Sequence, residues 1–306
     1  MLLIGENIHI ISKSVREALE NRNRAFIESL IKMQLNMDFI DLNIGPARGK
    51  LEGVMSWLTD IAQNISDKGI SFDTSNFTEI QNGFEVLKNK QSAFINSTSR
   101  DEEKLELLTD TAAEYGCNLI ALTMSKETGI PKTSDGRLEL AFEIYEKCME
   151  KSIDNGNIYF DPLVLPVSVE QSQALEVLNT IKMIKESFDP PVKTVIGLSN
   201  ISNGSPQEIR PLINRVFGVM AYGAGLDAAI IDAKDTELVR ILKMLKENTP
   251  HSNIDELYIN IAHMVENFSG LDEVQYDKDD IEQVKIIKTT GILLGKSVYS
   301  HSFTQI

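Results

Sequence analysis

Short apolar runs and longer amphipathic stretches alternate along the chain. The apolar runs are brief and continuous rather than interrupted at every second residue, which is typical of parallel strands that are covered on both faces. We predict eight strands, at Leu2–Ile4, Phe39–Leu42, Gly69–Phe72, Ser92–Ile95, Leu119–Leu122, Ile158–Phe160, Thr194–Gly197 and Ala228–Ile231.

The stretches between these runs have helical periodicity. Leu175, Leu178 and Ile181, for example, recur every three residues and therefore share one helical face. We predict helices at Val15–Leu35, Leu51–Ile65, Glu103–Tyr115, Leu138–Lys151, Leu175–Lys185, Asp235–Lys246 and Ile281–Leu294.

Eight strand–helix units within about 250 residues are the unit number and size of a (β/α)₈ TIM barrel. A doubly wound sheet is the alternative, but no glycine-rich phosphate turn follows the first strand. We therefore predict an α/β protein with one TIM-barrel domain over residues 1–306. The polar, acidic segment at about 248–280 is interpreted as an insertion in the last βα unit.

The composition excludes several classes of protein. The formal net charge of −15 argues against a nucleic-acid surface, which needs clustered lysine and arginine. The acidic surface either docks a basic partner or only keeps the protein in solution. Cys117 and Cys148 have no zinc or redox spacing, and no apolar run is long enough for a signal sequence or a bilayer span. We expect a cytoplasmic protein that binds neither membranes nor nucleic acid.

Polar residues follow almost every predicted strand. In a TIM barrel these positions lie at the end of the barrel where ligands bind. Helix capping is the alternative role for such residues, and it is strongest at Asn76 and Asp235. The strand-end residues are Glu6, Asn7, Asp41, Asn43, Asp73, Asn96, Ser97, Thr123, Asp161, Ser199, Asn200 and Asp232.

At five of these positions we favour a role in ligand binding, because the residue follows its apolar run directly instead of opening a helix. They are Asp41, Asp73, Asn96, Asp161 and Asn200.

Other kinds of catalytic group are missing from the sequence. The four histidines form no HxH or HExxH motif, so we predict no metal site. Lys193 precedes its strand rather than following it, so it is not placed for a Schiff base, and no serine has a histidine partner nearby. A mouth of hydrogen-bonding groups without a nucleophile suits a planar, polar heterocycle whose own reactivity is used.

Several segments resemble one family in their order along the chain. They are GENI, DLNIGP, INSTS, LTMSKETGIPKTSDGR, DPLVLPVS, GLSNIS, RPLINRVF and GLDAAIIDA. This set is similar to the methyltetrahydrofolate:corrinoid methyltransferases, which include the folate module of methionine synthase and the enzyme that serves the corrinoid iron-sulfur protein. They are pterin-binding barrels related to dihydropteroate synthase. The resemblance runs from Leu2 to about Ala233 and resumes in the last helix.

The resemblance implies roles for individual residues. Asp73, Asn96 and Asp161 would hold the pterin ring, whose guanidine-like N–H edge suits a carboxylate. Asn200 would lie near N5, the atom that carries the methyl group. Gly197 and Ser199 would line the same pocket, together with Asn203 and Arg210, although the loop NGSPQEIR is longer than its family counterpart.

The resemblance also implies an activity, the transfer of a methyl group between N5 of tetrahydrofolate and the cobalt of a corrinoid. The substrates would be tetrahydrofolate and 5-methyltetrahydrofolate. A partner corrinoid protein would carry the cobalamin, because the chain has no DxHxxG cobalamin motif. Asn200 would act catalytically by hydrogen bonding to N5, and Asp161 by organising the water that brings the proton. A homodimer is expected by analogy.

The direction of transfer stays open, and the folate-methylating component of a demethylase system is one interpretation. Two other functions also stay open. One is a dihydropteroate synthase-like pterin enzyme, although no pyrophosphate site or TPDSF-like loop is found. The other is a folate-binding protein without catalysis.

Overall fold

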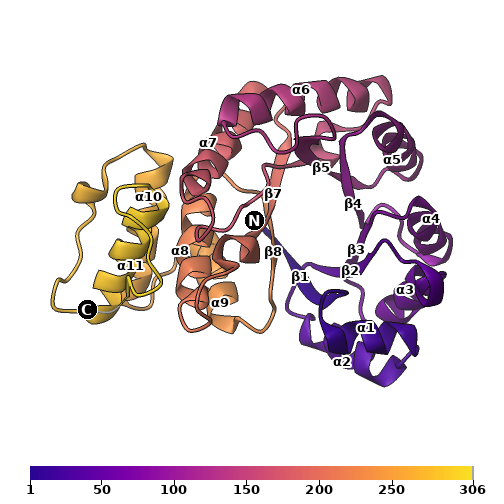
Figure 1. The fold of residues 1–306 in the computed structure, drawn as a ribbon, viewed down its shortest axis with the longest axis horizontal. Coiled ribbons are helices and arrows are strands. Elements are labelled where there is room, and N and C mark those ends of the chain that lie inside the picture. Colours follow the sequence, from indigo (N-terminus) through magenta and orange to yellow (C-terminus); the bar gives the residue numbers. More distant parts are fainter. Residues whose placement is uncertain (305–306) are drawn as a thin grey trace.

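Eight parallel strands close into one barrel in the computed structural model, which describes residues 1–304. The ring is complete because Ile4 of β1 pairs with Phe39 of β2 on one side and with Ile230 of β8 on the other. Figure 1 shows the strands around the centre with helices outside them. The strands are β1 (Leu2–His9), β2 (Phe39–Gly45), β3 (Gly69–Thr74), β4 (Ala93–Arg100), β5 (Asn118–Ser125), β6 (Ile158–Asp161), β7 (Lys193–Gly197) and β8 (Ala228–Ile231).

All eight predicted strands and the TIM-barrel fold are confirmed. The helices are α1 (Lys13–Glu20), α2 (Arg24–Met33), α3 (Val54–Ile65), α4 (Phe77–Val86), α5 (Glu102–Tyr115), α6 (Ser134–Glu150), α7 (Ser172–Ser187), α8 (Arg210–Gly223), α9 (Thr236–Glu247), α10 (Asn253–Glu266) and α11 (Ile281–Leu293).

The prediction of one helix over Val15–Leu35 is wrong, because α1 and α2 are separate. The chain turns at Arg22, whose φ of 51° lies in the left-handed region and ends the first helix. Asn23 then caps α2 by accepting a hydrogen bond from the Phe26 amide at 3.2 Å.

Two residues whose side chains were expected to cap helices do so. Asn76 accepts a hydrogen bond from the Thr78 amide at 3.1 Å at the start of α4. Asp235 accepts one from the Leu238 amide at 3.0 Å at the start of α9. Both side chains satisfy helix N–H groups that would otherwise lack a partner.

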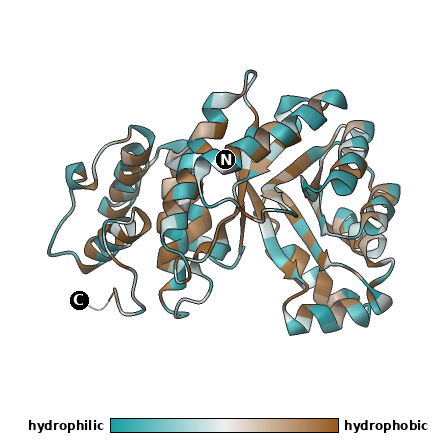
Figure 2. Cartoon of the chain, turned by 45° about the horizontal axis from the view of Figure 1, so that its top comes forward, coloured by the Kyte–Doolittle hydropathy of each residue, from teal (hydrophilic) through white to brown (hydrophobic). Residues whose placement is uncertain are grey.

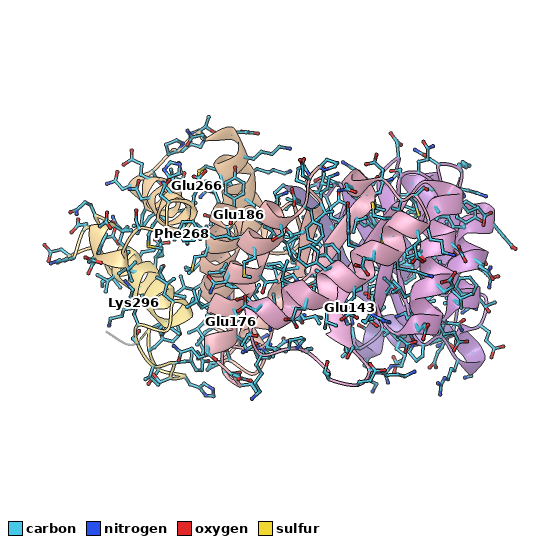
Figure 3. All side chains as sticks on the ribbon, turned by 90° about the horizontal axis from the view of Figure 1, so that it is seen from above. Glu143, Glu176, Glu186, Glu266, Phe268 and Lys296 are labelled. Carbon is cyan, nitrogen blue, oxygen red and sulfur yellow. The ribbon has the colours of Figure 1, made fainter. Side chains whose placement is uncertain are left out.

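The region predicted as an insertion follows α9 and contains α10, which the sequence did not reveal. Helices α10 and α11 pack on the outer side of α8, as Figure 1 shows. Gly223 of α8 permits this packing, because a Cβ there would lie 2.2 Å from the carbonyl oxygen of Ala262. In Figure 3, Glu266 and Phe268 lie toward one end of this added pair and Lys296 toward the other.

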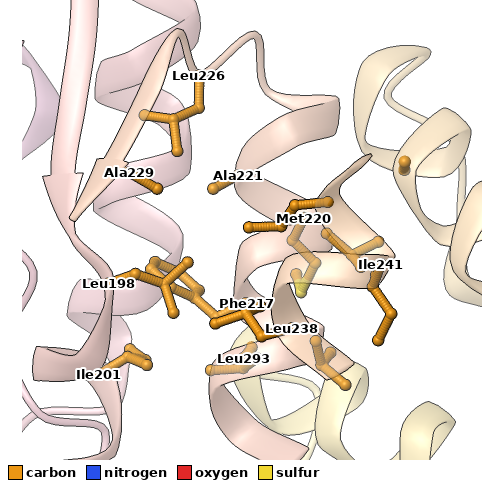
Figure 4. Packing of buried hydrophobic residues seen from close by; sticks show 14 of the residues in the cluster. Leu198, Ile201, Phe217, Met220, Ala221, Leu226, Ala229, Leu238, Ile241 and Leu293 are labelled. Carbon is orange, nitrogen blue, oxygen red and sulfur yellow. The ribbon is translucent and has the colours of Figure 1, made fainter. Parts of the chain in front are cut away.

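The added helices share a hydrophobic cluster with the barrel. In Figure 4, Phe217 of α8 lies toward Leu198 and Met220 of α8 lies toward Ile241 of α9, and all of these residues belong to one hydrophobic cluster. The added helices are therefore packed on the barrel through shared apolar contacts.

A separate apolar layer fills the barrel interior below the mouth. Figure 2 shows hydrophobic residues concentrated on the strands and polar residues on the outer faces of the helices. The interior layer consists of Ile4, Phe94, Ile120, Tyr159, Val195 and Ala228.

No helix among residues 1–304 has the length and apolar character needed to cross a membrane.

Candidate functional site

The candidate site lies directly above the interior apolar layer, at the carboxyl ends of the strands. Side chains two residues apart on a strand point to the same face. Tyr159 of β6 lies in the interior layer, so Asp161 is the next inward residue. In the same way Asn96 follows Phe94 on β4. The strand periodicity therefore stacks a polar layer on the apolar one.

One cluster in the polar layer lies where β2, β3 and β4 adjoin. The Asn96 Nδ2 donates to Asp41 Oδ1 at 3.3 Å, and the Asn43 Nδ2 donates to Asp73 Oδ2 at 2.5 Å. Burial raises the pKa of Asp73 to about 6, although the bond from Asn43 lowers it. Burial and the negative charge of Asp73 raise the pKa of Asp41 well above its usual value. This cluster therefore retains a proton close to neutral pH.

Asp161 stands across the barrel from this cluster and is 7% exposed. Its Oδ1 accepts a hydrogen bond from the Leu163 amide at 2.7 Å. Among residues 1–304 its Oδ2 has no hydrogen-bond donor, so this oxygen is available to a ligand. Burial raises the pKa of Asp161 to about 7, while the Leu163 amide and the charge of Arg137 lower it.

Arg137 of α6 is a residue that the sequence analysis missed. Its side chain is fully buried, and its Nη2 donates to Gln173 Oε1 at 2.6 Å. Within residues 1–304 its Nε and Nη1 have no hydrogen-bond partner. A buried guanidinium near Asp161 favours the ionised form of that carboxylate.

A third group joins the first and last strands of the barrel. Ser199 Oγ donates to Glu6 Oε1 at 2.6 Å. Burial raises the pKa of Glu6 to about 7, the bond from Ser199 lowers it, and the charge of Asp232 raises it. Asn7 Nδ2 in turn donates to Asp232 Oδ1 at 2.5 Å. Glu6 can therefore hold or release a proton at neutral pH.

Asn200 lies on the short 3₁₀ helix Leu198–Ser202 that follows β7. It is exposed, and its Oδ1 accepts a hydrogen bond from Asn203 Nδ2 at 3.3 Å. A Cβ on Gly197 would lie 3.0 Å from Asn200 Nδ2, so the glycine lets this side chain fold back over the end of β7. Arg210 is also exposed, and its Nε donates to the carbonyl oxygen of Ser205 at 2.8 Å.

The structure brings most of the predicted site residues to the barrel mouth. Asn203 joins them through Asn200, whereas Arg210 has no contact with the polar layer and instead stabilises the loop before α8. Glu6 and Asp232 were predicted as strand-end residues but not favoured for ligand binding, although strand periodicity supports such a role because both lie two residues beyond an inward apolar residue. Arg137 was overlooked although it is the last residue of the segment LTMSKETGIPKTSDGR, one of those that resemble the family. The predicted residues at the mouth are Asp73, Asn96, Asp161, Gly197, Ser199 and Asn200.

This arrangement suits a planar ligand that has N–H groups on one edge and polar atoms around its rim. Buried carboxylates and amides supply acceptors and donors on several sides of the mouth, and apolar side chains form its floor. Within residues 1–304, no group of three histidine, cysteine, aspartate or glutamate side chains is arranged to hold a metal ion.

Comparisons with known proteins identify relatives of this chain. A methylcorrinoid:tetrahydrofolate methyltransferase of Eubacterium limosum is 26% identical over 243 residues, which cover 78% of this chain and 88% of that protein. A methionine synthase of Mycobacterium tuberculosis is 29% identical over 246 residues, which cover 76% of this chain but only 20% of that protein.

Solved structures with the same fold include dihydropteroate synthases. The enzyme from Anaplasma phagocytophilum with bound 6-hydroxymethylpterin-monophosphate has a TM-score of 0.54 at 14% identity, with 80% of this chain and 98% of that chain covered. The enzyme from Coxiella burnetii in complex with pteroic acid has a TM-score of 0.54 at 15% identity, with 79% and 91% covered. At these identities the likeness shows a shared fold.

The profile of the family described as pterin binding enzyme matches residues 42–232, which include β3 to β8 and most of the polar layer. The match covers more than half of the chain, so this protein belongs to the family of pterin-binding enzymes.

Proposed function

We propose that this protein transfers a methyl group between N5 of tetrahydrofolate and the cobalt of a corrinoid. The observation that carries the proposal is the polar layer at the barrel mouth, centred on the buried Asp161 with its free Oδ2. The similarity to the methylcorrinoid:tetrahydrofolate methyltransferase of Eubacterium limosum supports the same activity.

The pterin ring binds through its N–H edge. An ionised Asp161 accepts hydrogen bonds from the 2-amino group and N3 of the pterin, with the nearby Arg137 favouring the charged form. Asn96 and Asp73 bind the opposite side of the ring, since they lie on β4 and β3. The apolar layer below supports the ring and keeps water away from these bonds.

Asn200 acts at N5. When the methyl group leaves, the bond between N5 and carbon breaks, its electron pair stays on N5, and N5 takes up a proton. Negative charge develops on N5 as the bond to the methyl group breaks. A hydrogen bond from Asn200 to N5 strengthens at the same time, and this lowers the activation free energy of methyl transfer. In the opposite direction N5 loses its proton and its lone pair forms the new bond. A bound corrinoid supplies the cobalt centre that exchanges the methyl group.

The proton for N5 comes from groups that titrate near neutral pH. Glu6 has a pKa of about 7 and is hydrogen bonded to Ser199, the residue before Asn200. Asp161 has a similar pKa and lies on the neighbouring side of the mouth. We assign the proton to Glu6 and Ser199, with water as the link to N5, because Asp161 must remain ionised to bind the pterin.

The proposal includes further parts. A separate corrinoid protein carries the cobalamin to the mouth, the enzyme is a cytoplasmic homodimer, and it is the folate-methylating component of a demethylase system. The alternative functions are a dihydropteroate synthase-like enzyme and a folate-binding protein without catalysis.

A spectroscopic assay under anaerobic conditions tests the proposal. Purified protein is mixed with methylcobalamin and tetrahydrofolate, and separately with cob(I)alamin and 5-methyltetrahydrofolate. We expect the cobalt spectra to interconvert, with relative rates that indicate the physiological direction. Folate binding without any spectral change, even with a corrinoid protein added, would contradict methyl transfer. Release of pyrophosphate from a pterin pyrophosphate and p-aminobenzoate would instead identify a dihydropteroate synthase.

A further inference from the structure

We propose that the segment after α11, residues 294–304, positions the loop that carries Asn200. The positioning residues are Gln171, which holds this post-α11 segment, and Tyr299, which connects it to the loop. The inference rests on the proposed function, because it concerns the geometry of the residue that acts at N5.

The post-α11 segment lies on the mouth side of the barrel. Each barrel helix begins near the carboxyl end of the preceding strand, so the start of α7 marks the mouth side. In Figure 3, Lys296 lies toward the same end of the molecule as Glu176, near the start of α7. Glu186, near the end of α7, lies toward the opposite end. The segment is therefore placed to contact the loops of the mouth.

Gln171 binds the post-α11 segment at three points. It is the last residue of the loop that leads from Asp161 to α7. Its Nε2 donates to the carbonyl oxygens of Ile292 at 2.7 Å and Ser297 at 2.6 Å. Its Oε1 accepts a hydrogen bond from the Tyr299 amide at 2.8 Å. One half-buried side chain thus holds the segment against the β6–α7 loop.

Tyr299 connects the segment to the β7–α8 loop, which carries Asn200. Its hydroxyl donates to Ser205 Oγ at 2.7 Å, and Ser205 is only 2% exposed. The Ser205 amide donates to the carbonyl oxygen of Ser202 at 3.0 Å. The Asn203 amide donates to the carbonyl oxygen of Asn200 at 3.2 Å. Two successive turns therefore link the residue that Tyr299 anchors to Asn200.

The two loops also bind each other, so the segment holds them as a pair. The Val167 amide donates to the carbonyl oxygen of Ile201 at 2.9 Å. Ser168 Oγ donates to the carbonyl oxygen of Asn203 at 2.7 Å. Gly204 permits this approach, because its φ of 78° is left-handed and a Cβ there would lie 2.7 Å from Ser168 Oγ.

Asn200 needs this support because it has few contacts of its own. Its side chain is exposed on a short 3₁₀ helix, and Asn203 Nδ2 donates to its Oδ1 at 3.3 Å. The rate of methyl transfer depends on where Asn200 lies relative to N5, since small displacements of a reacting group have large effects. Supporting hydrogen bonds from neighbouring elements fix such a position.

Tyr299→Phe removes only the hydroxyl and tests the connection. The ring stays, and with it the packing against Phe303, whose centroid lies 5.9 Å away. We expect the rate of methyl transfer at saturating folate to fall about tenfold, because Asn200 is less well positioned. Stopped-flow spectra of the cobalt centre measure this rate. The dissociation constant of tetrahydrofolate should not change, since Asp161 holds the ring. An equal loss of rate and affinity would overturn the proposal.

A matched control is Tyr222→Phe. The Tyr222 hydroxyl donates to the carbonyl oxygen of Leu245 at 3.2 Å, near the ends of α8 and α9 and away from the mouth. Both tyrosines pack against the same hydrophobic cluster. The control variant should transfer methyl groups at the wild-type rate. A tenfold loss in both variants would show a general effect of losing a hydroxyl bond and would overturn the positioning role.

A double-mutant cycle tests whether Tyr299 acts through Asn200. In the Asn200→Ala background, Tyr299→Phe should change the rate by less than about twofold, because the group that it positions is already absent. Gln171→Leu removes the other attachment of the segment and should show the same dependence on Asn200. A further tenfold loss in the Asn200→Ala background would mean that Tyr299 acts independently of Asn200, and would overturn the proposal.

Amide hydrogen exchange of residues 198–209 gives a readout that does not depend on activity. These amides should exchange faster in Tyr299→Phe than in the wild type, while the rest of the barrel stays unchanged. If the wild type transfers no methyl group, the proposed function fails whatever the exchange shows. If the wild type transfers methyl groups and Tyr299→Phe alters neither rate nor exchange, only the positioning role fails.

Discussion

Two inward layers of the same barrel, one apolar and one polar, differ in how completely their groups are satisfied. In the lower layer Phe94 packs edge-on against Phe39 at 4.8 Å and against Tyr159 at 4.7 Å between ring centroids. In the upper layer, two residues further along β4 and β6, Asn96 and Asp161 take the places of Phe94 and Tyr159. Along one strand, inward side chains two residues apart therefore have different roles, the first in apolar packing and the next in the polar site.

The comparison shows which layer stabilises the folded barrel and which one destabilises it. Fully buried apolar side chains stabilise the fold through burial and dispersion. Buried carboxylates do the reverse when they are charged, and burial raises the pKa of Asp161 and Glu6 to about 7. Groups kept in an unfavourable environment are candidates for ligand binding or proton transfer.

The largest effect on activity is expected at the rim of the polar layer. Asn200→Ala should lower the rate of methyl transfer by about 100- to 1000-fold, because a hydrogen bond formed in the transition state is lost. The dissociation constant of tetrahydrofolate should change by only a few fold. Stopped-flow spectra of the cobalt centre give the rate, and a binding titration gives the affinity. An unchanged rate would remove Asn200 from the chemistry.

A substitution in the lower, apolar layer should reduce the free energy of unfolding without changing the affinity for folate. Phe94→Ala should reduce the free energy of unfolding by about 3–5 kcal/mol, the usual cost of removing a buried phenyl ring. Urea unfolding measures this change. At a temperature where the variant is folded, its folate affinity should stay within a few fold of the wild type. A specific loss of affinity would show that the two layers are not independent.

Asp161→Asn separates charge from shape in the upper layer. Its amide oxygen can still accept the Leu163 bond, but its Nδ2 presents a donor to the pterin where the carboxylate presented an acceptor. We expect the dissociation constant of tetrahydrofolate to rise about 100-fold, as expected for two charge-assisted hydrogen bonds. Isothermal titration measures the change. Retained affinity would place Asp161 outside the contacts with the ring.

The strands and the polar layer were predictable because both follow from local patterns. A continuous apolar run such as Leu119–Leu122 marks a strand covered on two sides, and the polar residue at its end marks the mouth. The break between α1 and α2 was not predictable in this way. The apolar spacing continues across Arg22, and only the left-handed backbone there shows that the helix ends.

Tertiary packing determines the features that the sequence did not reveal. Arg137 lies in the first turn of an amphipathic helix, where arginine is usually exposed, and only the packing of α6 against α7 buries it. In α10, Leu257, Tyr258 and Ile261 have helical spacing, but the acidic residues around them obscured the pattern. The apolar face of α10 is buried only because α10 packs against α8.

The pH dependence of binding tests the charge state of the polar layer. Asp161 must be ionised to accept the pterin N–H edge, and its pKa is about 7. Affinity for tetrahydrofolate should therefore be constant at alkaline pH and fall as the pH drops below 7, by about 30-fold at pH 5.5. Asp161→Asn should bind weakly with a flatter profile. A flat profile for the wild type would mean that the carboxyl group is not the titrating group.

The smallest effect expected is a gain in stability from the same Asp161→Asn substitution. The folded-state pKa of Asp161 lies above its unfolded value of 3.8, so the protonated form stabilises the fold and this contribution is lost as the pH rises through 7. At pH 8, without ligand, the variant should be more stable than the wild type by about 1–3 kcal/mol, because no buried charge is formed. The gain should shrink as the pH is lowered to 5. Thermal unfolding of both proteins at the two pH values measures this gain. A variant that is less stable than the wild type at pH 8 would show that the attraction between Arg137 and the ionised carboxylate exceeds the free-energy cost of burying that charge.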